Sequence, residues 1–387
     1  MIALALMLAA APQARAWDHH DALTALALRD IPVLDSSVVP ETLDAYLTAS
    51  LRAGGKAVFL RAIKVNPTTD FPSRAGEAFG APVAARAVIS AYADEPDWGL
   101  DQSLFDYYPE LWKDDYQFMG GRTGPQTRAF RHMYWPGGFY RQPSPPARIP
   151  VHDPTPLGEA PQRCSLFFSL AREAFASGHP YWGARFLAWS LHYLEDLGQP
   201  FHATQLATTM FVRPTPDGRS IDVEKTTRVV AYFHLAVDGF PQHSGEGPNG
   251  GPLRARETAD LVGTAAIPFS SALSLAQDAA VVSAGQAQVL GEAAADFFPD
   301  PDAGALADPA GRVYTDQFWT SLQAAVAADP RGSEAFLTPL DARLADTAVR
   351  ARTLVLEALK SVPAAPAPQA PGLAARPVPL LAPPLFR

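Results

Sequence analysis

Three residues near the middle of the chain have the types and spacing of a metal site. In the run AWSLHYLEDLGQPFH, His192 and Asp196 are four residues apart, so on a helix they share one face. Gly198 and Pro200 then break the helix, which lets His202 approach the same cavity from outside it. Imidazole and carboxylate ligands without a thiolate suit zinc in a catalytic role. An isolated pair of this spacing is also compatible with an ordinary hydrogen bond on a helix surface.

A second pair with the same spacing lies further along the chain. His234 and Asp238 fall in the apolar run VVAYFHLAVD, where burying an imidazole and a carboxylate is costly unless they are paired or bind metal. Two more candidate ligands precede the first pair. His132 lies in an aromatic loop, and Asp97 lies in DEPDWGLD, where Asp101 is its rival.

The single cysteine, Cys164, limits the kinds of site that are possible. One cysteine forms no intramolecular disulfide and cannot supply a cysteine-rich zinc site. Any metal site must therefore use His, Asp and Glu. Cys164 itself begins an apolar helical stretch, which favours a packing role.

Composition and charge narrow the classes of partner. The 387 residues are 48% hydrophobic and 18% charged, which is typical of a globular protein with a sizeable core. The formal net charge of -9 argues against a broad surface for duplex nucleic acid. It does not exclude a small cleft that binds one phosphate.

The first residues have the pattern of an export signal. Residues 1–14 are uncharged and mostly Ala, Leu and Met, and Ala14-Arg15-Ala16 follows as a small-x-small cleavage signature. We predict a signal peptide over residues 1–16, with Trp17 as the mature N-terminus and a secreted or periplasmic protein. A buried N-terminal helix is the alternative.

The remaining periodicity predicts an all-α protein, because no stretch alternates long enough to indicate a sheet. We expect one all-helical domain over residues 17–361 and a Pro/Ala-rich disordered tail at 362–387. Residues 97–157 and 240–253 read as loops. The predicted helices cover 19–31, 41–53, 83–95, 160–197 divided at Gly178 and Pro180, 223–239, 254–296 with a break near Pro268, 314–328 and 338–361.

The motif HYLEDLGQPFH resembles the signature of the secreted zinc-dependent bacterial phospholipases C, whose fold the single-strand-specific zinc nucleases share. The spacing of its His, Asp and His matches, as does the Gln-Pro before the last His. The resemblance covers about residues 17–300. It implies an all-α fold, three zinc ions and a mature N-terminal Trp that binds zinc through its amino nitrogen and carbonyl oxygen.

The resemblance implies a ligand set for each zinc ion. Some positions keep rivals: Asp101 for Asp97, His19 for His20, and His243 as a fallback at the third site. The phospholipases usually have Glu where Asp238 stands, whereas the nucleases have Asp. His152 and His179 match nothing in the motif. The implied sites are Asp97, His132, His192 and Asp196; Trp17, His20 and the shared Asp196; and His202, His234 and Asp238.

The implied activity is hydrolysis of a phosphodiester by zinc-activated water, with Asp97 as general base or water-orienting group. A phospholipase C acting on glycerophospholipids is our first hypothesis, with Trp98, Tyr134 and Trp135 binding substrate and Phe139 and Tyr140 beside them. Such a protein would be monomeric, contact a membrane surface transiently and hold no stable nucleic-acid partner. One alternative is a zinc nuclease or nucleotidase on the same scaffold, in which the aromatic residues would stack on the bases of the substrate. The other is a non-catalytic secreted zinc-binding protein.

Overall fold

The computed structural model describes most of the chain between residues 20 and 362. The predicted signal peptide, Trp17 and His19, most of the segment 97–157, the first part of the helix predicted at 254–296 and nearly all of the tail lie outside the described residues. The described ranges are 20–50, 52, 54–73, 79–101, 130–141, 151–243, 267–303 and 309–362.

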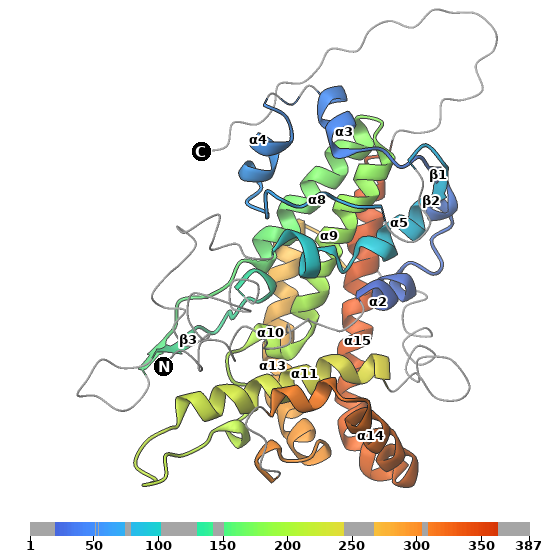
Figure 1. Cartoon of the computed structure of the whole chain (residues 1–387). Helices are drawn as coiled ribbons and strands as arrows, with labels where there is room; N and C mark the ends of the chain where they lie inside the picture. Colours follow the sequence, from blue (N-terminus) through green and yellow to red (C-terminus); the bar gives the residue numbers. More distant parts are fainter. Residues whose placement is uncertain are drawn as a thin grey trace, which may run out of the picture.

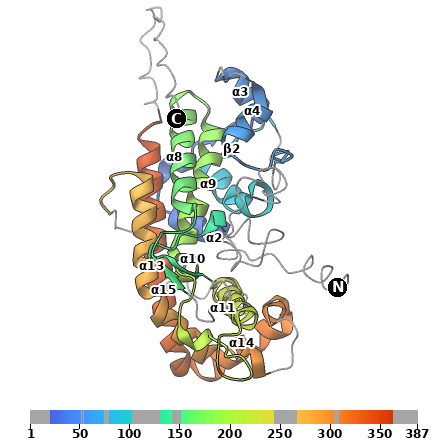
Figure 2. The same cartoon turned by 90° about the vertical axis from the view of Figure 1, so that its left-hand side faces the viewer.

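Long helices dominate the described part, as the all-α prediction required. Four of them form an upright bundle, and α13 and α15 run along one edge of it (Figures 1 and 2). Helix α11 lies across the lower end of this bundle, close to α14 (Figure 1). The bundle helices are α8 (Ala160–Ala176), α9 (Pro180–Gly198), α13 (Ala272–Phe297) and α15 (Pro330–Leu359), and the lower pair are α11 (Val223–His243) and α14 (Asp316–Ala328).

Shorter elements flank the bundle. Helices α2 and α5 contact each other, and both contact α9. One turn of π-helix, η3, follows α5. The short helices are α2 (His20–Ala27), α3 (Leu43–Ala49), α4 (Gly55–Ala62), α5 (Ala85–Tyr92) and α10 (Pro200–Ala203), with η3 at Pro96–Leu100 and 3₁₀ turns η2 (Pro32–Asp35), η6 (Thr209–Phe211), η7 (Pro301–Ala303) and η8 (Ala310–Tyr314).

Two small antiparallel sheets, each of two strands, accompany the helices. Strand β1 (Ser37–Val38) pairs with β2 (Val83–Ala84), with Ser37 opposite Ala84. Strand β3 (Phe139–Arg141) pairs with β4 (Val151–Asp153), with Tyr140 opposite His152. Strands of two or three residues are too short to give a readable alternation, so the expectation of no sheet missed them.

The ends of several helices differ from the predicted ones. Helix α15 begins at Pro330, eight residues before the predicted start at 338, because Asp329 caps it by accepting a hydrogen bond from the backbone N–H of Gly332. Pro339 and Pro241 both lie inside helices, so α11 continues to His243, beyond its predicted end at 239. Helix α4 was not predicted at all.

Helix α9 is the centre of the molecule. Every residue from Tyr181 to Gly198 is buried, and Trp182, Phe186 and Trp189 fill the main core. Gly198 is required by packing: a Cβ there would lie 1.9 Å from the Oγ1 atom of Thr347 in α15. A helix this enclosed holds its polar side chains in fixed positions.

A second core lies around α11 and α14, with Tyr232, Phe240 and Trp319 among its members. The C-terminal part of α9, then α10, leads the chain from the first core toward the second. Among the described residues, no helix combines the length and the apolar character needed to cross a bilayer.

Candidate metal centre

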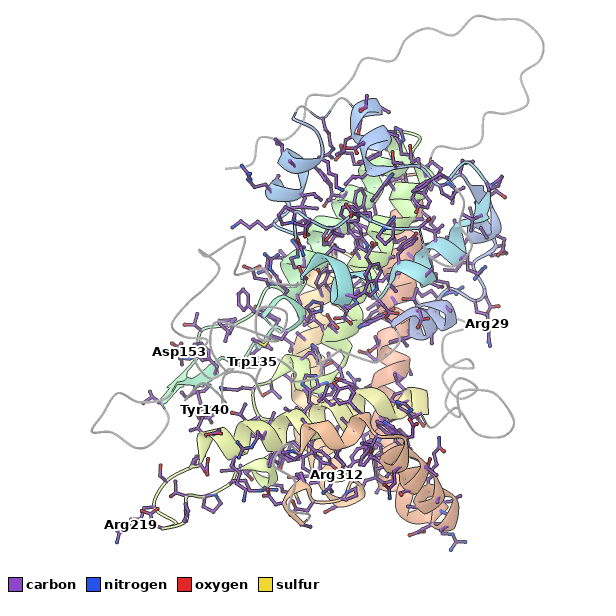
Figure 3. The ribbon with its side chains drawn as sticks, in the orientation of Figure 1. Arg29, Trp135, Tyr140, Asp153, Arg219 and Arg312 are labelled. Atoms are coloured by element: carbon purple, nitrogen blue, oxygen red, sulfur yellow. The ribbon has the colours of Figure 1, made fainter. Side chains whose placement is uncertain are left out.

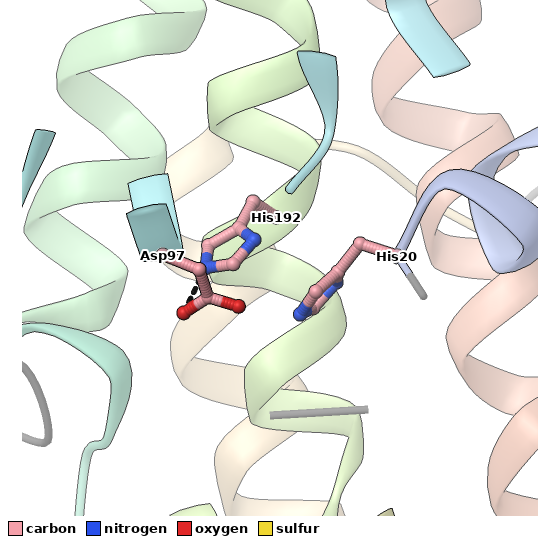
Figure 4. A group of neighbouring side chains, drawn as sticks. All are labelled: His20, Asp97 and His192. Carbon is pink, nitrogen blue, oxygen red and sulfur yellow. Dashed lines mark ion pairs between the residues drawn. The ribbon is translucent and has the colours of Figure 1, made fainter. Parts of the chain in front are cut away.

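Helix α9 and the turn η3 carry the central residues of the site. His192 and Asp196 are one turn apart on α9, and both are fully buried. Asp97 enters from η3, and Figure 4 shows its carboxylate pointing at the His192 ring with His20 on the other side. Glu95, two residues before Asp97, forms a buried ion pair with Arg185 of α9. This ion pair fixes η3 against that helix. The Thr69 hydroxyl also holds η3, by donating to the carbonyl of Gly99 at 2.7 Å.

Five side chains meet here, and we call them the inner cluster: His20, Asp97, His132, His192 and Asp196. The Nδ1 atom of His132 lies 2.9 Å from Asp196 Oδ2 and 2.8 Å from His192 Nε2. Asp97 Oδ1 lies 3.7 Å from each of these ring nitrogens. His20 Nε2 lies 3.3 Å from the other oxygen of Asp196. The ligand atoms fall into two groups that share His192: His20, Asp97 and His192, and His132, His192 and Asp196.

Three further side chains form what we call the outer cluster: His202 of α10 with His234 and Asp238 of α11. The Nε2 atoms of the two histidines are 2.8 Å apart, and Asp238 Oδ2 lies 3.0 Å from His234 Nε2. His202 Nδ1 donates to the backbone carbonyl of His132, so its Nε2 carries the lone pair that faces the cluster. The two clusters are thus joined through the backbone of an inner ligand.

The donor atoms in both clusters fit a divalent cation. In each cluster two imidazole nitrogens point at each other beside a carboxylate, an arrangement that brings lone pairs together. The buried polar atoms without a hydrogen-bond partner in the described part of the chain include three in the clusters, His20 Nε2, Asp196 Oδ1 and Asp238 Oδ2, beside others elsewhere such as Tyr46 Oη and Trp135 Nε1. Buried polar atoms are rarely left unsatisfied, and a cation held at each cluster would give these three atoms a partner. Nitrogen and oxygen ligands without sulfur suit zinc.

The electrostatics of the inner cluster favour positive charge. Burial lowers the pKa of the His132 ring, but the charge of Asp196 and the hydrogen bond of Asp101 outweigh it and raise that pKa to about 9. Burial also works against charge on His20, yet the Asp196 and Glu195 carboxylates bring its pKa well above the ordinary value. Burial disfavours the Asp196 carboxylate, but the imidazoles of His192 and His132 hold its pKa well below the usual range.

The outer cluster behaves in the opposite way. Burial and the neighbouring imidazole of His234 lower the pKa of His202 to about 4, although Asp196 and Asp238 act against this. His202 is therefore a neutral imidazole at pH 7, with a lone pair available for metal.

The structure separates the two rival aspartates. Asp97 faces the inner cluster, whereas Asp101 lies at the far side of the His132 ring, 3.3 Å from its Nε2 atom. There Asp101 also accepts a hydrogen bond from the hydroxyl of Tyr193 and lies 3.7 Å from the Arg163 guanidinium. Asp101 therefore orients His132, as carboxylates behind metal-bound histidines do.

Sequence reasoning missed two supporting residues. Gln199 donates through its side-chain nitrogen to Asp238 and accepts from the backbone N–H of Phe201, so it both positions a ligand and caps α10. Glu195 contacts His20. Both residues lie inside the motif HYLEDLGQPFH. The sequence signal that could have identified them is a polar residue within an otherwise apolar stretch.

The remaining histidines take part in other contacts. His179 precedes α9 and pairs with Glu41, and His152 contacts the backbone carbonyl of Gly137. His243, the fallback ligand, stacks on Trp319 with ring centroids 4.2 Å apart. Of the rivals His19 and His20, the structure describes only His20.

The aromatic residues expected to bind substrate are not equally placed. Trp135 is 7% exposed and packs with Phe130, Met133, Phe139 and Leu157 in a small core of its own, so Trp135 and Phe139 have a packing role there. Trp98 and Tyr134 are partly buried, and Tyr140 is 47% exposed. Figure 3 shows Trp135, Tyr140 and Asp153 near the small β3–β4 sheet, on the opposite side of the view from Arg29.

The fold and the clusters together define an all-α protein with three groups of buried His and Asp side chains able to bind metal ions. The third group contains the three residues that the resemblance implied, whereas the two inner groups share His192 rather than Asp196, and His20 falls with Asp97 and His192. Neither a family model nor a curated protein matches the sequence.

Among solved structures, the chain is similar to the alpha-toxin of Clostridium perfringens, isolated from avian strain SWCP. The match covers 91% of this chain and 66% of that chain, with 12% sequence identity and a TM-score of 0.31.

Proposed function

We propose that this protein is a zinc-dependent phosphodiester hydrolase, and that it acts as a phospholipase C on glycerophospholipids. The observation that carries the proposal is the convergence of eight His and Asp side chains, from α2, η3, the turn at 130–132, α9, α10 and α11, into three groups. Three zinc ions per chain would account for these groups. When bound, such ions lower the pKa of a water molecule and offset the charge of the phosphate.

We assign different roles to the residues of the two clusters. Asp97 is the residue we assign to orient the attacking water and accept its proton, since it lies at the edge of the inner cluster rather than between the paired imidazoles. His132, His192 and Asp196 would be metal ligands in the inner cluster. The outer cluster, with His202 and His234, would face the leaving oxygen.

The charge of the site itself supports metal dependence. Asp97, Asp101, Glu195 and Asp196 are all buried around the inner cluster, and the negative charge of these carboxylates opposes the binding of a phosphate. Bound cations reverse the local charge, which lets a protein of net charge -9 bind an anionic substrate.

A lipid substrate is supported by the aromatic residues near Asp97. Trp98 follows Asp97 directly and is partly exposed, and Tyr134 donates its backbone N–H to the carbonyl of His202. We propose that these side chains contact acyl chains or a quaternary ammonium head group. We propose a monomer that contacts a membrane surface transiently and is exported, with cleavage before Trp17 creating the amino ligand.

A zinc nuclease or nucleotidase is the second candidate, and Asp238 favours it, since the nucleases have Asp at this position. The same aromatics would then stack bases. A non-catalytic zinc-binding protein requires no hydrolysis at all.

One set of assays separates the three. The secreted, processed protein would be loaded with zinc, and its metal content measured by mass spectrometry. Phosphocholine release from lecithin would then be compared with nucleotide release from single-stranded DNA. Faster lecithin hydrolysis supports the phospholipase, faster DNA hydrolysis the nuclease, and neither activity with zinc bound the third. Fewer than two zinc ions per chain would refute the shared mechanism. A mature start at Trp17, found by N-terminal sequencing, would support the amino ligand.

A further inference from the structure

Glu195 is a buried carboxylate that lies next to Asp196 in α9 and contacts the inner cluster from behind, at His20 of α2. One oxygen, Oε2, lies 2.9 Å from His20 Nδ1. The other, Oε1, accepts a hydrogen bond from the Thr24 hydroxyl at 2.7 Å. All three side chains are fully buried. Because Thr24 follows His20 by one turn of α2, that helix engages both oxygens of the carboxylate at once.

These contacts fix which nitrogen of His20 carries the proton. An ionised carboxylate only accepts hydrogen bonds, so His20 Nδ1 must be the donor. In the neutral ring the lone pair is then on Nε2, which faces Asp196 Oδ1 at 3.3 Å. Neither of these two atoms has a hydrogen-bond partner in the described part of the chain. Two facing acceptors are stable only with a proton or a cation between them, so a bound metal ion would take the place of a proton on Nε2.

Glu195 is not placed to be a ligand itself. Both of its oxygens are engaged by α2, and it is absent from the groups of side chains whose ligand atoms converge. What Glu195 adds is orientation of the His20 ring and a second negative charge behind it. A carboxylate that holds the other nitrogen of a metal-bound imidazole fixes its tautomer and raises its basicity.

We propose that Glu195 is the positioning residue for His20: it fixes the Nδ1–H tautomer, so that Nε2 faces the metal, and Thr24 holds Glu195 in place. This inference rests on the proposed zinc site. It predicts that loss of the carboxylate weakens one zinc ion and leaves the outer cluster loaded.

The test compares four variants of the full zinc-loaded chain. Glu195→Met removes the acceptor at similar length, while Glu195→Gln keeps an amide oxygen that can accept from Nδ1–H and an amide nitrogen that can donate to Thr24. Thr24→Val removes only the hydroxyl. Glu41→Gln is the matched control, since Glu41 pairs with His179 in the same way at 3.0 Å but away from both clusters.

Zinc affinity would be measured by competition with a chromophoric chelator. We expect Glu195→Met to lower the affinity for one zinc ion about 10- to 100-fold, as is typical when a residue that hydrogen-bonds to a metal ligand is lost. Glu195→Gln should recover most of that loss, Thr24→Val should show a smaller loss, and Glu41→Gln none. If Glu195→Met does not fold, Thr24→Val and Glu195→Gln carry the test. Wild-type affinity in folded Glu195→Met, or in Thr24→Val when Glu195→Met does not fold, would overturn the inference.

A second readout does not depend on zinc. In ¹⁵N-histidine-labelled, metal-free protein, His20 (assigned with a His20→Asn variant) should show a protonated Nδ1, and Glu195→Met should change that signature. An unchanged tautomer in Glu195→Met would overturn the inference. A wild-type protein that binds no zinc would instead refute the proposed function, while the tautomer would still report on the contact between Glu195 and His20.

Discussion

The inner and outer clusters use the same ligand chemistry in different surroundings. The inner cluster draws its side chains from four separate segments, has two carboxylates in contact with its imidazoles, and is almost fully buried. The outer cluster comes from two elements, has one carboxylate, and leaves the His234 side chain 20% exposed. The pKa of His132 rises to about 9 while that of His202 falls to about 4. The inner cluster thus favours positive charge, and the outer one offers a neutral imidazole.

This difference assigns different tasks to the two clusters. Carboxylate-rich, enclosed surroundings hold ions tightly and exclude competing water. A more open site with fewer charges exchanges its ion and its oxygen ligand more readily. We therefore expect the inner zinc ions to be the more tightly bound, and the outer ion to bind the leaving oxygen.

The largest effect should come from His192→Ala, because His192 belongs to both inner groups. Loss of a residue that only hydrogen-bonds to a metal ligand typically lowers metal affinity or activity about 10- to 100-fold. Loss of the ligand His192 itself should therefore lower hydrolysis by at least about 100-fold. Zinc content should fall while the outer ion remains. The His152→Ala variant, which changes a contact on the β3–β4 sheet, is the control and should behave as wild type. Undiminished hydrolysis in His192→Ala would show that the site is misassigned.

A smaller effect is expected at the outer cluster. His234→Ala should remove one zinc ion and reduce the rate about 10- to 100-fold, with the inner ions retained. Metal analysis by mass spectrometry and lecithin turnover would check both parts. If this variant lost every ion, the two clusters would be one cooperative site, and the comparison between them would fail.

Proton release should also distinguish the clusters. In metal-free protein at pH 7, His132 holds a proton that zinc must displace, because its pKa is raised, whereas His202 holds none, because its pKa is lowered. Zinc affinity at the inner cluster should therefore fall as pH is lowered from about 8 to about 6, and affinity at the outer cluster should fall less, because His202 holds no proton to displace. Calorimetry in buffers of different ionisation enthalpy measures the protons released. If wild type and His234→Ala release the same number of protons on binding zinc, the release belongs to the inner cluster, as expected. If His234→Ala releases no protons, the release belongs to the outer cluster and the assignment is contradicted.

The same shift has a consequence for stability without metal. A raised pKa of His132 in the folded chain stabilises the fold fully below the unfolded value of about 6.5, and this contribution is lost as pH rises through about 9. The chelator-treated protein should therefore unfold at lower denaturant concentration at the alkaline end of this window. A midpoint that rises across it would disagree with a protonated His132.

The smallest effect concerns the scaffold between the clusters. Gly198→Ala should cost about 1–3 kcal/mol of unfolding free energy, because the new methyl group meets Thr347 of α15. Gly218→Ala, where a Cβ meets no atom within 4 Å, controls for added bulk but adopts a positive φ of 66°, so a small loss is expected there too. A Gly198→Ala protein as stable as wild type would mean that α9 and α15 can move apart.

Much of the fold and the site followed from local patterns. Pro180, Gly178 and the apolar periodicity around them predicted the division between α8 and α9, and the four-residue spacing of His192 and Asp196 predicted their common face. The predicted start of α15 at 338 was too late, because the helix begins at Pro330, where Asp329 caps it, and continues through Pro339. The short strands were missed because pairing between distant residues decides them.

The sequence by itself determined the helical class, the residue types able to bind metal and their spacing along α9, since these depend on neighbours within a few residues. Only the tertiary structure decided which aspartate faces the inner cluster, that His192 belongs to both inner groups, and that Glu195 contacts His20. Asp97 and Asp101 are one helical turn apart in the sequence, and what separates them is that α9 places His192 on one side of the His132 ring and Tyr193 on the other. Contacts between segments far apart in the chain leave no mark on local spacing, because they depend on how the helices pack.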